Sequence, residues 1–390
     1  MSWEECILSN LIDLKYGKSL PERDREAGEV PVYGSSGVTG YHNKPLIEGP
    51  GIIVGRKGTI GSVHYENRDF FPIDTVYYVK GDESKIGLKF TYYLLKTLPL
   101  NKLNTDAAVP GLNRNNALRV KCKVPSLKKQ DKIVSTLSAY DDLIENNRRR
   151  IQLLEESARL LYREWFVHFR FPGHEYVELV DGLPQGWEEV KFEDTSLKFI
   201  DGDRGKNYPN HSEFCHNGYC LFLSAKNVTS GDKFNFSNEL MFITKEKDSI
   251  LRSGKLKRGD LVLTTRGTVG NIAYYDDSIN FENIRINSGM VILRDFEDDF
   301  ESYYLYVTLR SLSFKDQIKN FTSGTAQPQL PIRDLKKMKI LKPSSKIMKN
   351  YCAVLKSSSL QIQNLELQNQ KLKKARDILL PRLMNGEIAV

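Results

Sequence analysis

Two short segments carry the residue types best suited to contact a phosphate or the edge of a base. "RKGTIGSVHY" begins at Arg56 and "TRGTVGNIAY" begins at Thr265, and four of the ten positions are identical. In both, glycines allow a tight backbone turn that carries a cation, Lys57 or Arg266, followed two residues later by a threonine. This composition suits close approach to a polyanion. The alternative is a plain hairpin whose basic residue is simply solvated.

Small polar side chains accompany both turns. "GSSGVTGYHN" (34–43) precedes the first and "LSAKNVTSG" (223–231) precedes the second, so hydrogen-bonding groups recur at matching places. Recognition tends to lie on polar loops carried by a rigid sheet. The predicted DNA-binding residues are Ser35, Ser36, Thr39, Tyr41, Arg56, Lys57, Thr59 and Arg114 in the first half and Lys226, Asn227, Thr265, Arg266, Thr268 and Gln327 in the second.

Other candidate motifs do not predict catalysis. "YGKS" (16–19) ends like a phosphate-binding loop, but Ile12 stands where that loop needs glycine. "WEEVK" (187–191) has the E-x-K spacing of some nuclease sites, whereas its counterpart "WEECI" (3–7) lacks the lysine, which favours a surface turn. The possible zinc ligands His211, Cys215, His216 and Cys220 do not form a standard pair of pairs. We therefore predict no catalytic residue, no metal and no cofactor in this chain.

Composition sets the limits on the protein class. The 390 residues, 40% of them hydrophobic, suffice for two or three domains with sizeable cores. A net charge of +8 favours a polyanionic partner. The sequence has no apolar run of about 18 residues, and its first residues lack the basic-then-apolar order expected of a signal peptide. Its five cysteines have no framework spacing. We expect a cytoplasmic protein with no membrane partner.

The two turns belong to a longer internal repeat. "WEE" recurs after 187 − 3 = 184 residues, the glycine turn after 265 − 56 = 209, and the segment 108–125 returns as 326–343, after 326 − 108 = 218. The order of the elements does not change while the offset grows. This pattern predicts two diverged copies, with loop insertions in the second.

After the proline that closes each copy, large residues recur at alternating spacings of four and three, which is the seam of a coiled coil. The first seam comprises Ile133, Leu137, Tyr140, Ile144, Asn147, Ile151, Leu154, Ala158, Leu161 and Trp165. Adding 218 gives the second: Tyr351, Leu355, Ser358, Ile362, Leu365, Asn369, Leu372, Arg376, Leu379 and Leu383. Asn147 and Asn369 would fix the register of a helix pair. Two ordinary amphipathic helices, each packed on its own domain, are the alternative.

Within the copies, "GIIVGRKG", "VYYVK", "DLVLTTRG" and "GMVILRD" predict strands, and "KFTYYLLKTL" and "ESYYLYVTLRSL" predict helices. The fold class is therefore α+β, with two similar mixed α/β domains and two long helices. The expected divisions are a first recognition domain at 1–125, a central helix at 126–171 stopped by Pro172-Gly173, a linker at 172–186, a second recognition domain at 187–343 and a C-terminal helix at 344–390.

The glycine turns, "YREWFVHFRFPG" (162–173) and "LKKARDILLPRLMNGEI" (372–388) resemble the DNA-specificity subunit of type I restriction-modification systems, over essentially the whole chain. The resemblance implies two target-recognition domains, each reading one half of a split DNA site, separated by two antiparallel helices with a pseudo-two-fold relation. It also implies docking of two methyltransferase subunits and of translocase-nuclease subunits. S-adenosylmethionine, ATP and Mg would be bound by those partners. One departure from the family pattern lies at the start of the first long helix. The family usually has an acidic residue followed by glutamine there, whereas this chain has "PSLKKQDK" (125–132).

A duplicated reader fits DNA because the two strands of a duplex are related by local two-fold symmetry. A fused methyltransferase would need a cofactor-binding glycine-rich turn and an Asn-Pro-Pro-Tyr type motif, and the sequence has neither. The remaining alternatives are a coiled-coil adaptor and a standalone DNA-binding protein without restriction-modification partners.

Overall fold

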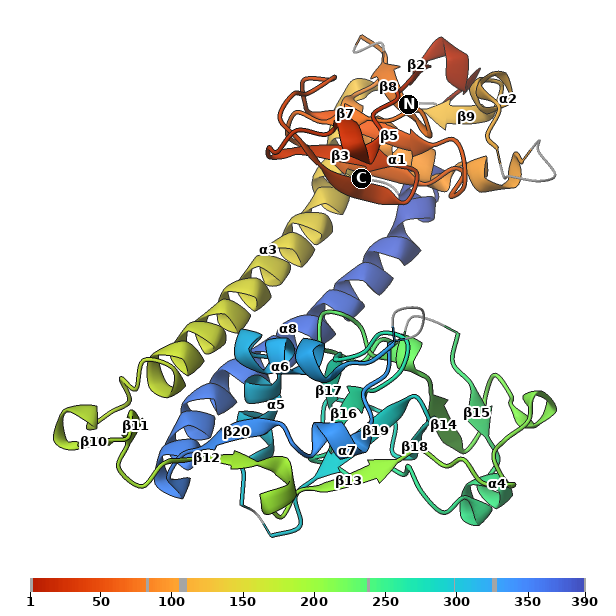
Figure 1. Ribbon diagram of the computed structural model, residues 1–390. Coiled ribbons are helices and arrows are strands. Elements are labelled where there is room, and N and C mark those ends of the chain that lie inside the picture. The colour runs from red at the N-terminus through yellow and green to blue at the C-terminus, as the bar shows by residue number, and fades with distance from the viewer. Residues whose placement is uncertain are drawn as a thin grey trace. The chain divides into compact units, whose positions relative to one another are not determined.

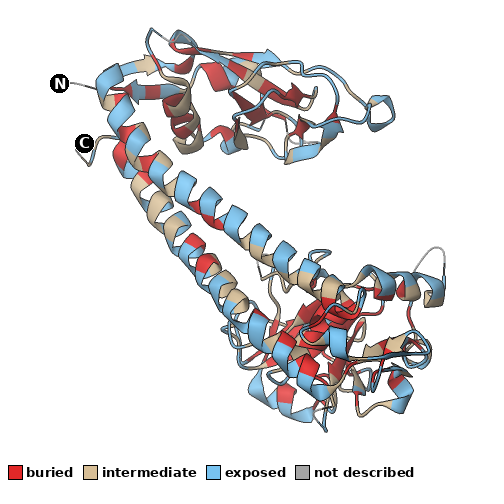
Figure 2. Ribbon diagram, turned by 90° about the vertical axis from the view of Figure 1, so that its left-hand side faces the viewer, coloured by how far each residue is buried: buried red, intermediate tan, exposed pale blue. Residues whose placement is uncertain are grey.

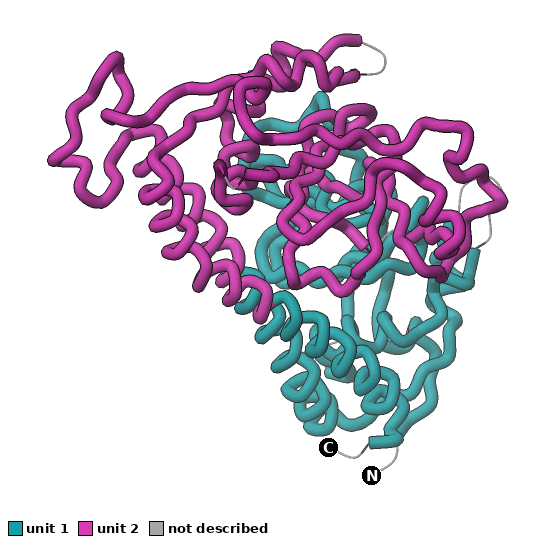
Figure 3. Tube along the Cα trace, turned by 90° about the horizontal axis from the view of Figure 1, so that it is seen from below, with its two compact units in different colours: residues 1–149, 366–390 teal, residues 150–365 magenta. Residues whose placement is uncertain are grey.

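The computed structural model describes residues 3–81, 84–104, 111–236, 239–297, 299–324 and 328–388. It divides into two compact units (Figure 3). Unit 1 comprises Met1–Arg149 and Glu366–Val390, and unit 2 comprises Arg150–Leu365. Unit 1 is therefore built from both ends of the chain. None of the helices in the described part of the chain is long and apolar enough to cross a membrane.

The described residues of unit 1 form three sheets. Its antiparallel four-stranded sheet has the order β2 (Ile12–Tyr16), β8 (Val76–Gly81), β5 (Gly51–Gly55) and β6 (Val63–Glu66). The three-stranded sheet has the order β4 (Gly37–His42), β3 (Val30–Gly34) and β7 (Phe71–Pro72), with β3 and β7 parallel. β1 (Glu4–Ile7) pairs with β9 (Lys121–Val124), and the short helices are α1 (Leu88–Thr97) and α2 (Arg114–Leu118).

Unit 2 repeats this topology. Its four-stranded sheet has the order β13 (Lys198–Asp201), β19 (Met290–Arg294), β16 (Leu261–Thr264) and β17 (Ile272–Tyr274). The three-stranded sheet has the order β15 (Phe242–Ile243), β14 (Cys220–Leu223) and β18 (Ile284–Ile286), with β14 and β18 parallel. β12 (Glu188–Lys191) pairs with β20 (Lys339–Lys342). The matching strand orders confirm the internal repeat (Figure 1).

The remaining elements of unit 2 are the hairpin of β10 (Leu179–Val180) and β11 (Leu183–Pro184) and the helices α4 (Lys245–Ile250), α5 (Ser302–Leu309), α6 (Leu312–Phe321) and α7 (Ile332–Leu335). Short 3-10 helices cover Leu8–Asn10, Glu22–Asp24, Leu100–Lys102, His174–Tyr176, Phe192–Asp194, His211–Glu213 and Ala225–Asn227. The predicted strands and helices within the two copies are confirmed.

Two helices of 40 residues, α3 (Leu127–Phe166) and α8 (Ser345–Met384), each contribute to both units. In unit 1, Ile133 and Leu137 of α3 share a hydrophobic core with Leu380 and Leu383 of α8. In unit 2, Trp165 near the end of α3 shares a core with residues near the start of α8. Within each unit the helices are therefore antiparallel, as expected.

All twenty predicted seam residues are buried or half-buried, which confirms the paired-helix interpretation (Figure 2). Asn147 Nδ2 donates a hydrogen bond to Asn369 Oδ1 at 3.0 Å, and these side chains are only 6% and 7% exposed. Near this pair, Arg376 forms an ion pair with Asp141 at 2.5 Å. The two seam asparagines thus face one another, as a register-fixing pair requires.

The helix α3 ends at Phe166, six residues before the Pro172 that was expected to stop it. Phe169 adopts a left-handed conformation with a φ of 57°, which an L residue adopts only when its surroundings favour it. Here the rings of Phe166 and Phe169 lie 5.8 Å from the ring of Trp187, and Phe171 stacks on it at 4.8 Å. Aromatic packing, rather than the proline, turns the chain away from the helix axis.

Candidate nucleic-acid interface

The repeated glycine turns connect equivalent strands, β5 to β6 in unit 1 and β16 to β17 in unit 2. Gly58 and Gly61 have φ values of 78° and 69°, and Gly267 and Gly270 have values of 75° and 93°. At Gly61 an added Cβ would lie 2.5 Å from the backbone nitrogen of Asn101. The turn therefore needs glycine both for its left-handed backbone and for its close packing.

Backbone hydrogen bonds clamp the turn of unit 1. Gly61 N donates to Gly55 O at 2.9 Å and closes the turn. The nitrogens of Arg56 and Lys57 both donate to Thr75 O, at 2.9 and 3.1 Å. Leu112 N donates to Arg56 O at 2.8 Å, which ties the turn to the segment that leads into α2. The turn is thus fixed from three sides.

The turn of unit 2 is clamped in the same way. Gly270 N donates to Thr264 O at 2.9 Å. Thr265 N and Arg266 N both donate to Gly289 O, at 2.8 and 3.2 Å, and Leu330 N donates to Thr265 O at 2.9 Å. Each bond has its counterpart in unit 1, so the repeat is conserved in its backbone interactions as well as in its sequence.

Both turns present a cation without a fixed partner. Lys57 and Arg266 are exposed, and no carboxylate in the described ranges lies within ion-pair distance of either. By contrast, Arg114 pairs with Asp13, and Arg285 pairs with Asp248 at 2.5 Å. The exposed threonines Thr59 and Thr268 lie on the same turns. These side chains are available to an anionic ligand.

The neighbouring polar loops lie against the turns. Ser62 Oγ donates to the carbonyl of Ser35 at 2.5 Å, which joins the glycine turn to the loop of Ser35 and Ser36. In unit 2, Asn271 Nδ2 donates to Val228 O at 3.0 Å and joins the turn to the loop that carries Lys226. Thr39 and Tyr41 lie farther along β4, both exposed.

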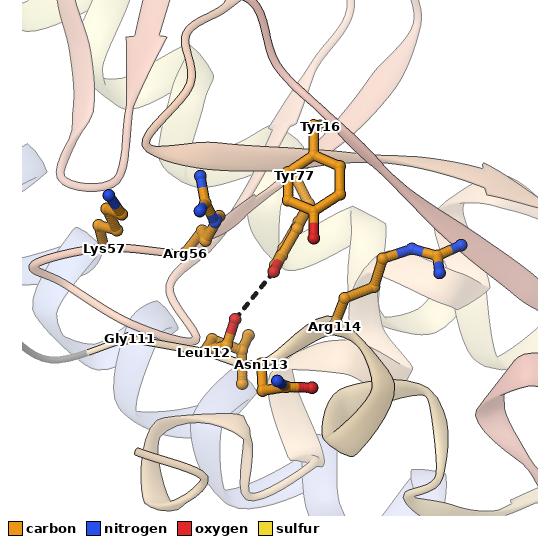
Figure 4. A pocket seen from close by; sticks show the side chains of 8 residues that line it. All are labelled: Tyr16, Arg56, Lys57, Tyr77, Gly111, Leu112, Asn113 and Arg114. Atoms are coloured by element: carbon orange, nitrogen blue, oxygen red, sulfur yellow. Dashed lines mark hydrogen bonds between the residues drawn. The ribbon is translucent and has the colours of Figure 1, made fainter. Parts of the chain in front are cut away.

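Unit 1 has a pocket beside its turn, lined by Tyr16, Arg56, Lys57, Tyr77, Gly111, Leu112, Asn113 and Arg114 (Figure 4). The Arg56 guanidinium lies 5.0 Å from the centre of the Tyr16 ring, a cation–π distance. Tyr77 donates its hydroxyl hydrogen to Leu112 O at 2.9 Å. Burial, followed by the effect of Tyr16, raises the pKa of Tyr77 to about 12, so this phenol stays neutral.

Three predicted contact residues are buried or engaged within the protein. Arg114 donates through Nε to Leu14 O at 2.7 Å and forms an ion pair with Asp13. Asn227 is 5% exposed and accepts a hydrogen bond from Ser224 N at 2.9 Å. Thr265 is also 5% exposed. The Asn227 side chain holds the loop that carries the exposed Lys226, and Gln327 is outside the described residues.

Sequence reasoning missed Tyr16 and Tyr77, although both line the pocket. Tyr16 directly precedes the Gly-Lys pair of "YGKS", so that motif marked a real feature but not a phosphate-binding loop.

The possible zinc ligands have separate partners: Cys215 Sγ donates to Phe242 O, and His216 lies 3.5 Å from Glu239. No cluster of three or more His, Cys, Asp or Glu side chains is placed to hold a metal within the described ranges.

A family model described as the type I restriction modification DNA specificity domain matches residues 1–156 and 184–374, the greater part of the chain. The chain belongs to this family. Each matched segment contains one copy of the repeat with its clamped glycine turn and part of the helix that follows. The sequence-based identification as a type I specificity subunit is therefore confirmed.

Relatives of known name agree with the family match. The type I restriction enzyme MjaIX specificity subunit of Methanocaldococcus jannaschii is 28% identical over 319 residues, which cover 77% of this chain and 69% of the relative. The HindI specificity subunit of Haemophilus influenzae is 23% identical over 333 residues, covering 72% and 71%. The crystal structure of a type I S subunit from M. genitalium shares the fold, with a TM-score of 0.59 and 17% identity over 98% of this chain and 96% of that one.

Proposed function

We propose that this specificity-family chain reads a split, asymmetric DNA site, with each unit contacting one half, and that it performs no catalysis itself. The observation that carries the proposal is the duplicated turn. Lys57 and Arg266 occupy equivalent positions on turns that the same backbone hydrogen bonds clamp, and neither is neutralised by a described carboxylate.

The turn suits DNA for physical reasons. A cation that contacts a phosphate releases condensed counterions, and this release supplies much of the affinity for a duplex. Ordering a flexible loop would cost conformational entropy, whereas the clamped turns are ordered before binding. The net charge of +8 also favours binding to DNA.

Methyl transfer would be carried out by partner subunits. Two methyltransferase subunits would dock on the long helices, bind S-adenosylmethionine and flip the target base from the stack. Translocase-nuclease subunits with ATP and Mg would complete a restriction complex. Large apolar side chains at the surface of α3 and α8 support docking there: Leu143, Leu153, Leu160, Val354, Leu360 and Leu367 are all exposed. A partner that covered these side chains would remove their apolar surface from water.

Binding at several salt concentrations tests the proposal. The complex of this chain with its methyltransferase subunits should bind random duplex with a steep salt dependence, and the methyltransferase subunits alone should bind it with a shallower one. A methylated-site map of cells carrying the system would then show one split target. An identical salt slope with and without this chain would refute the proposed DNA-reading role.

A further inference from the structure

A guanidinium lies at the same backbone carbonyl in both units, but it comes from a different segment in each. In unit 1, Arg56 Nη1 donates to Asp74 O at 2.8 Å. In unit 2, Arg204 Nη2 donates to Ser288 O at 3.1 Å. The two carbonyls are equivalent because each directly precedes the residue whose own carbonyl clamps the glycine turn. In both units a guanidinium therefore occupies this position, but Arg56 supplies it in unit 1 and Arg204 supplies it in unit 2.

The surroundings of the two guanidinium groups differ in charge. Arg204 lies 2.9 Å from the carboxylate of Asp201, which occupies the position of Tyr16 in the equivalent strand pair. Arg56 instead lies over the Tyr16 ring and, within the described part of the chain, has no carboxylate at ion-pair distance. The positive charge in unit 1 remains available to a ligand, whereas the charge in unit 2 is neutralised.

Several other polar groups around Arg56 are already engaged. Arg114 is paired with Asp13 and donates to a backbone carbonyl. Asn113 Oδ1 accepts from the backbone at the start of α2, at 2.9 and 3.2 Å. The Tyr77 hydroxyl donates to Leu112. Figure 4 shows the Arg56 guanidinium beside the two tyrosine rings and the Lys57 side chain farther from them. Of the cations among the described pocket-lining residues, Arg56 and Lys57 have no carboxylate partner and are left for DNA.

Only one of these two cations has a cationic equivalent in unit 2. Lys57 has its equivalent in Arg266, whereas the position of Arg56 is held in unit 2 by Thr265, which is buried. The phosphate backbone is the same at every site, so a shared cation suits a phosphate. The two half-sites differ only in their bases. A residue that is present in one unit and absent from the other is therefore suited to contact a base.

We propose that Arg56 is a specificity-determining residue that reads a guanine in the half-site recognised by unit 1, while Lys57 contacts the phosphate backbone. Arginine pairs with the O6 and N7 atoms of guanine through two parallel donors, and this pairing needs a guanidinium of fixed orientation. The bond to Asp74 and the stacking on Tyr16 supply that orientation. The inference rests on the proposed function.

The test uses this chain assembled with its methyltransferase subunits and a set of duplexes in which one base pair of one half-site is changed at a time. Arg56→Lys keeps the charge but lacks the planar fork. We expect it to lose on the order of 10- to 100-fold of the preference at a single G·C pair, with little change on unrelated DNA. Lys57→Ala, the matched variant on the same turn, should weaken binding to every duplex alike.

Three outcomes would overturn the inference alone. Arg56→Lys could discriminate as well as the wild type, lose affinity equally on all duplexes, or lose discrimination in both half-sites at once. The last result would show that Arg56 acts through the fold rather than through a base. A wild-type complex with no sequence preference would overturn the proposed function together with the inference.

Discussion

Lys57 and Arg266 combine an exposed charged side chain with a backbone that is held in place. We expect Lys57→Ala and Arg266→Ala each to weaken binding of the assembled methyltransferase to all DNA sequences. Because one phosphate contact is lost, the slope of log K against log salt should become shallower by about 1. Fluorescence anisotropy titrations at several salt concentrations measure both quantities.

Lys123→Ala is the control for this pair. Lys123 is exposed but lies 3.0 Å from Glu5, so its removal changes the net charge equally while deleting a cation that is already paired. The slope should stay at the wild-type value. If Lys123→Ala lowered the slope as much as the turn variants did, overall charge would explain binding. Unchanged binding in both turn variants would favour the plain hairpin.

The residue types and the internal repeat were enough to find the exposed cations Lys57 and Arg266. They did not predict which of the other polar candidates are buried. Asn227 has the same polar character as Ser36, yet its side chain caps a short helix because the chain folds back on it there. Arg56 could be named as a contact, but its stacking on Tyr16 depends on the pairing of β2 with β8, residues far apart in sequence. Local patterns do not contain such long-range contacts.

At the scale of the element, the Asn147–Asn369 pair offers a direct test of the helix register. Asn147→Leu should lower the free energy of unfolding by about 1–3 kcal/mol, since the buried amide of Asn369 would lose its partner. The double variant with Asn369→Leu should recover that loss, because two leucines pack well on a seam. Urea unfolding followed by circular dichroism measures the difference. A double variant less stable than the single one would contradict the pairing.

The long helices can be lengthened without losing this register. Leu154 and Ile362 each lie seven residues from the asparagine pair (154 − 147 = 7; 369 − 362 = 7), so they are opposite one another. A heptad inserted after Leu154 and another before Ile362 would add about 10 Å to each helix, equal to about three base pairs. We expect such a variant to prefer a longer spacer between unchanged half-sites. Methylated-site mapping that shows only the original spacing would contradict this role for the helices.

The existence of both helices followed from their seams, because a period of 3.5 residues persists over ten positions in each. Their ends were harder to place. Pro172 gave the stronger local signal for the end of α3, but the aromatic cluster around Trp187 ends the helix at Phe166. That cluster joins residues from two predicted segments, the central helix and the second recognition domain, so tertiary packing decided the boundary.

At the scale of the whole molecule, the matching sheet orders predict that the two units recognise DNA independently. Replacing residues 1–125 with the matching domain of another specificity subunit should change one half of the methylated site and leave the other half unchanged. Methylome sequencing reads both halves in one experiment. The matched control is the reciprocal exchange of residues 187–343, which should alter only the other half. Simultaneous changes in both halves would show that the units do not read separately.

Unit 1 is assembled from two stretches of chain, and this has a consequence for protein synthesis. Its first 149 residues leave the ribosome early, but its core also contains Leu380, Leu383 and Met384 of α8. The domain that is translated first is therefore the one completed last, after the contiguous unit 2 has emerged. Until then Ile133 and Leu137 lack part of their packing. A nascent chain stalled near residue 365 would expose this apolar surface to chaperones and proteases, so premature termination late in the gene would damage the recognition domain at its beginning.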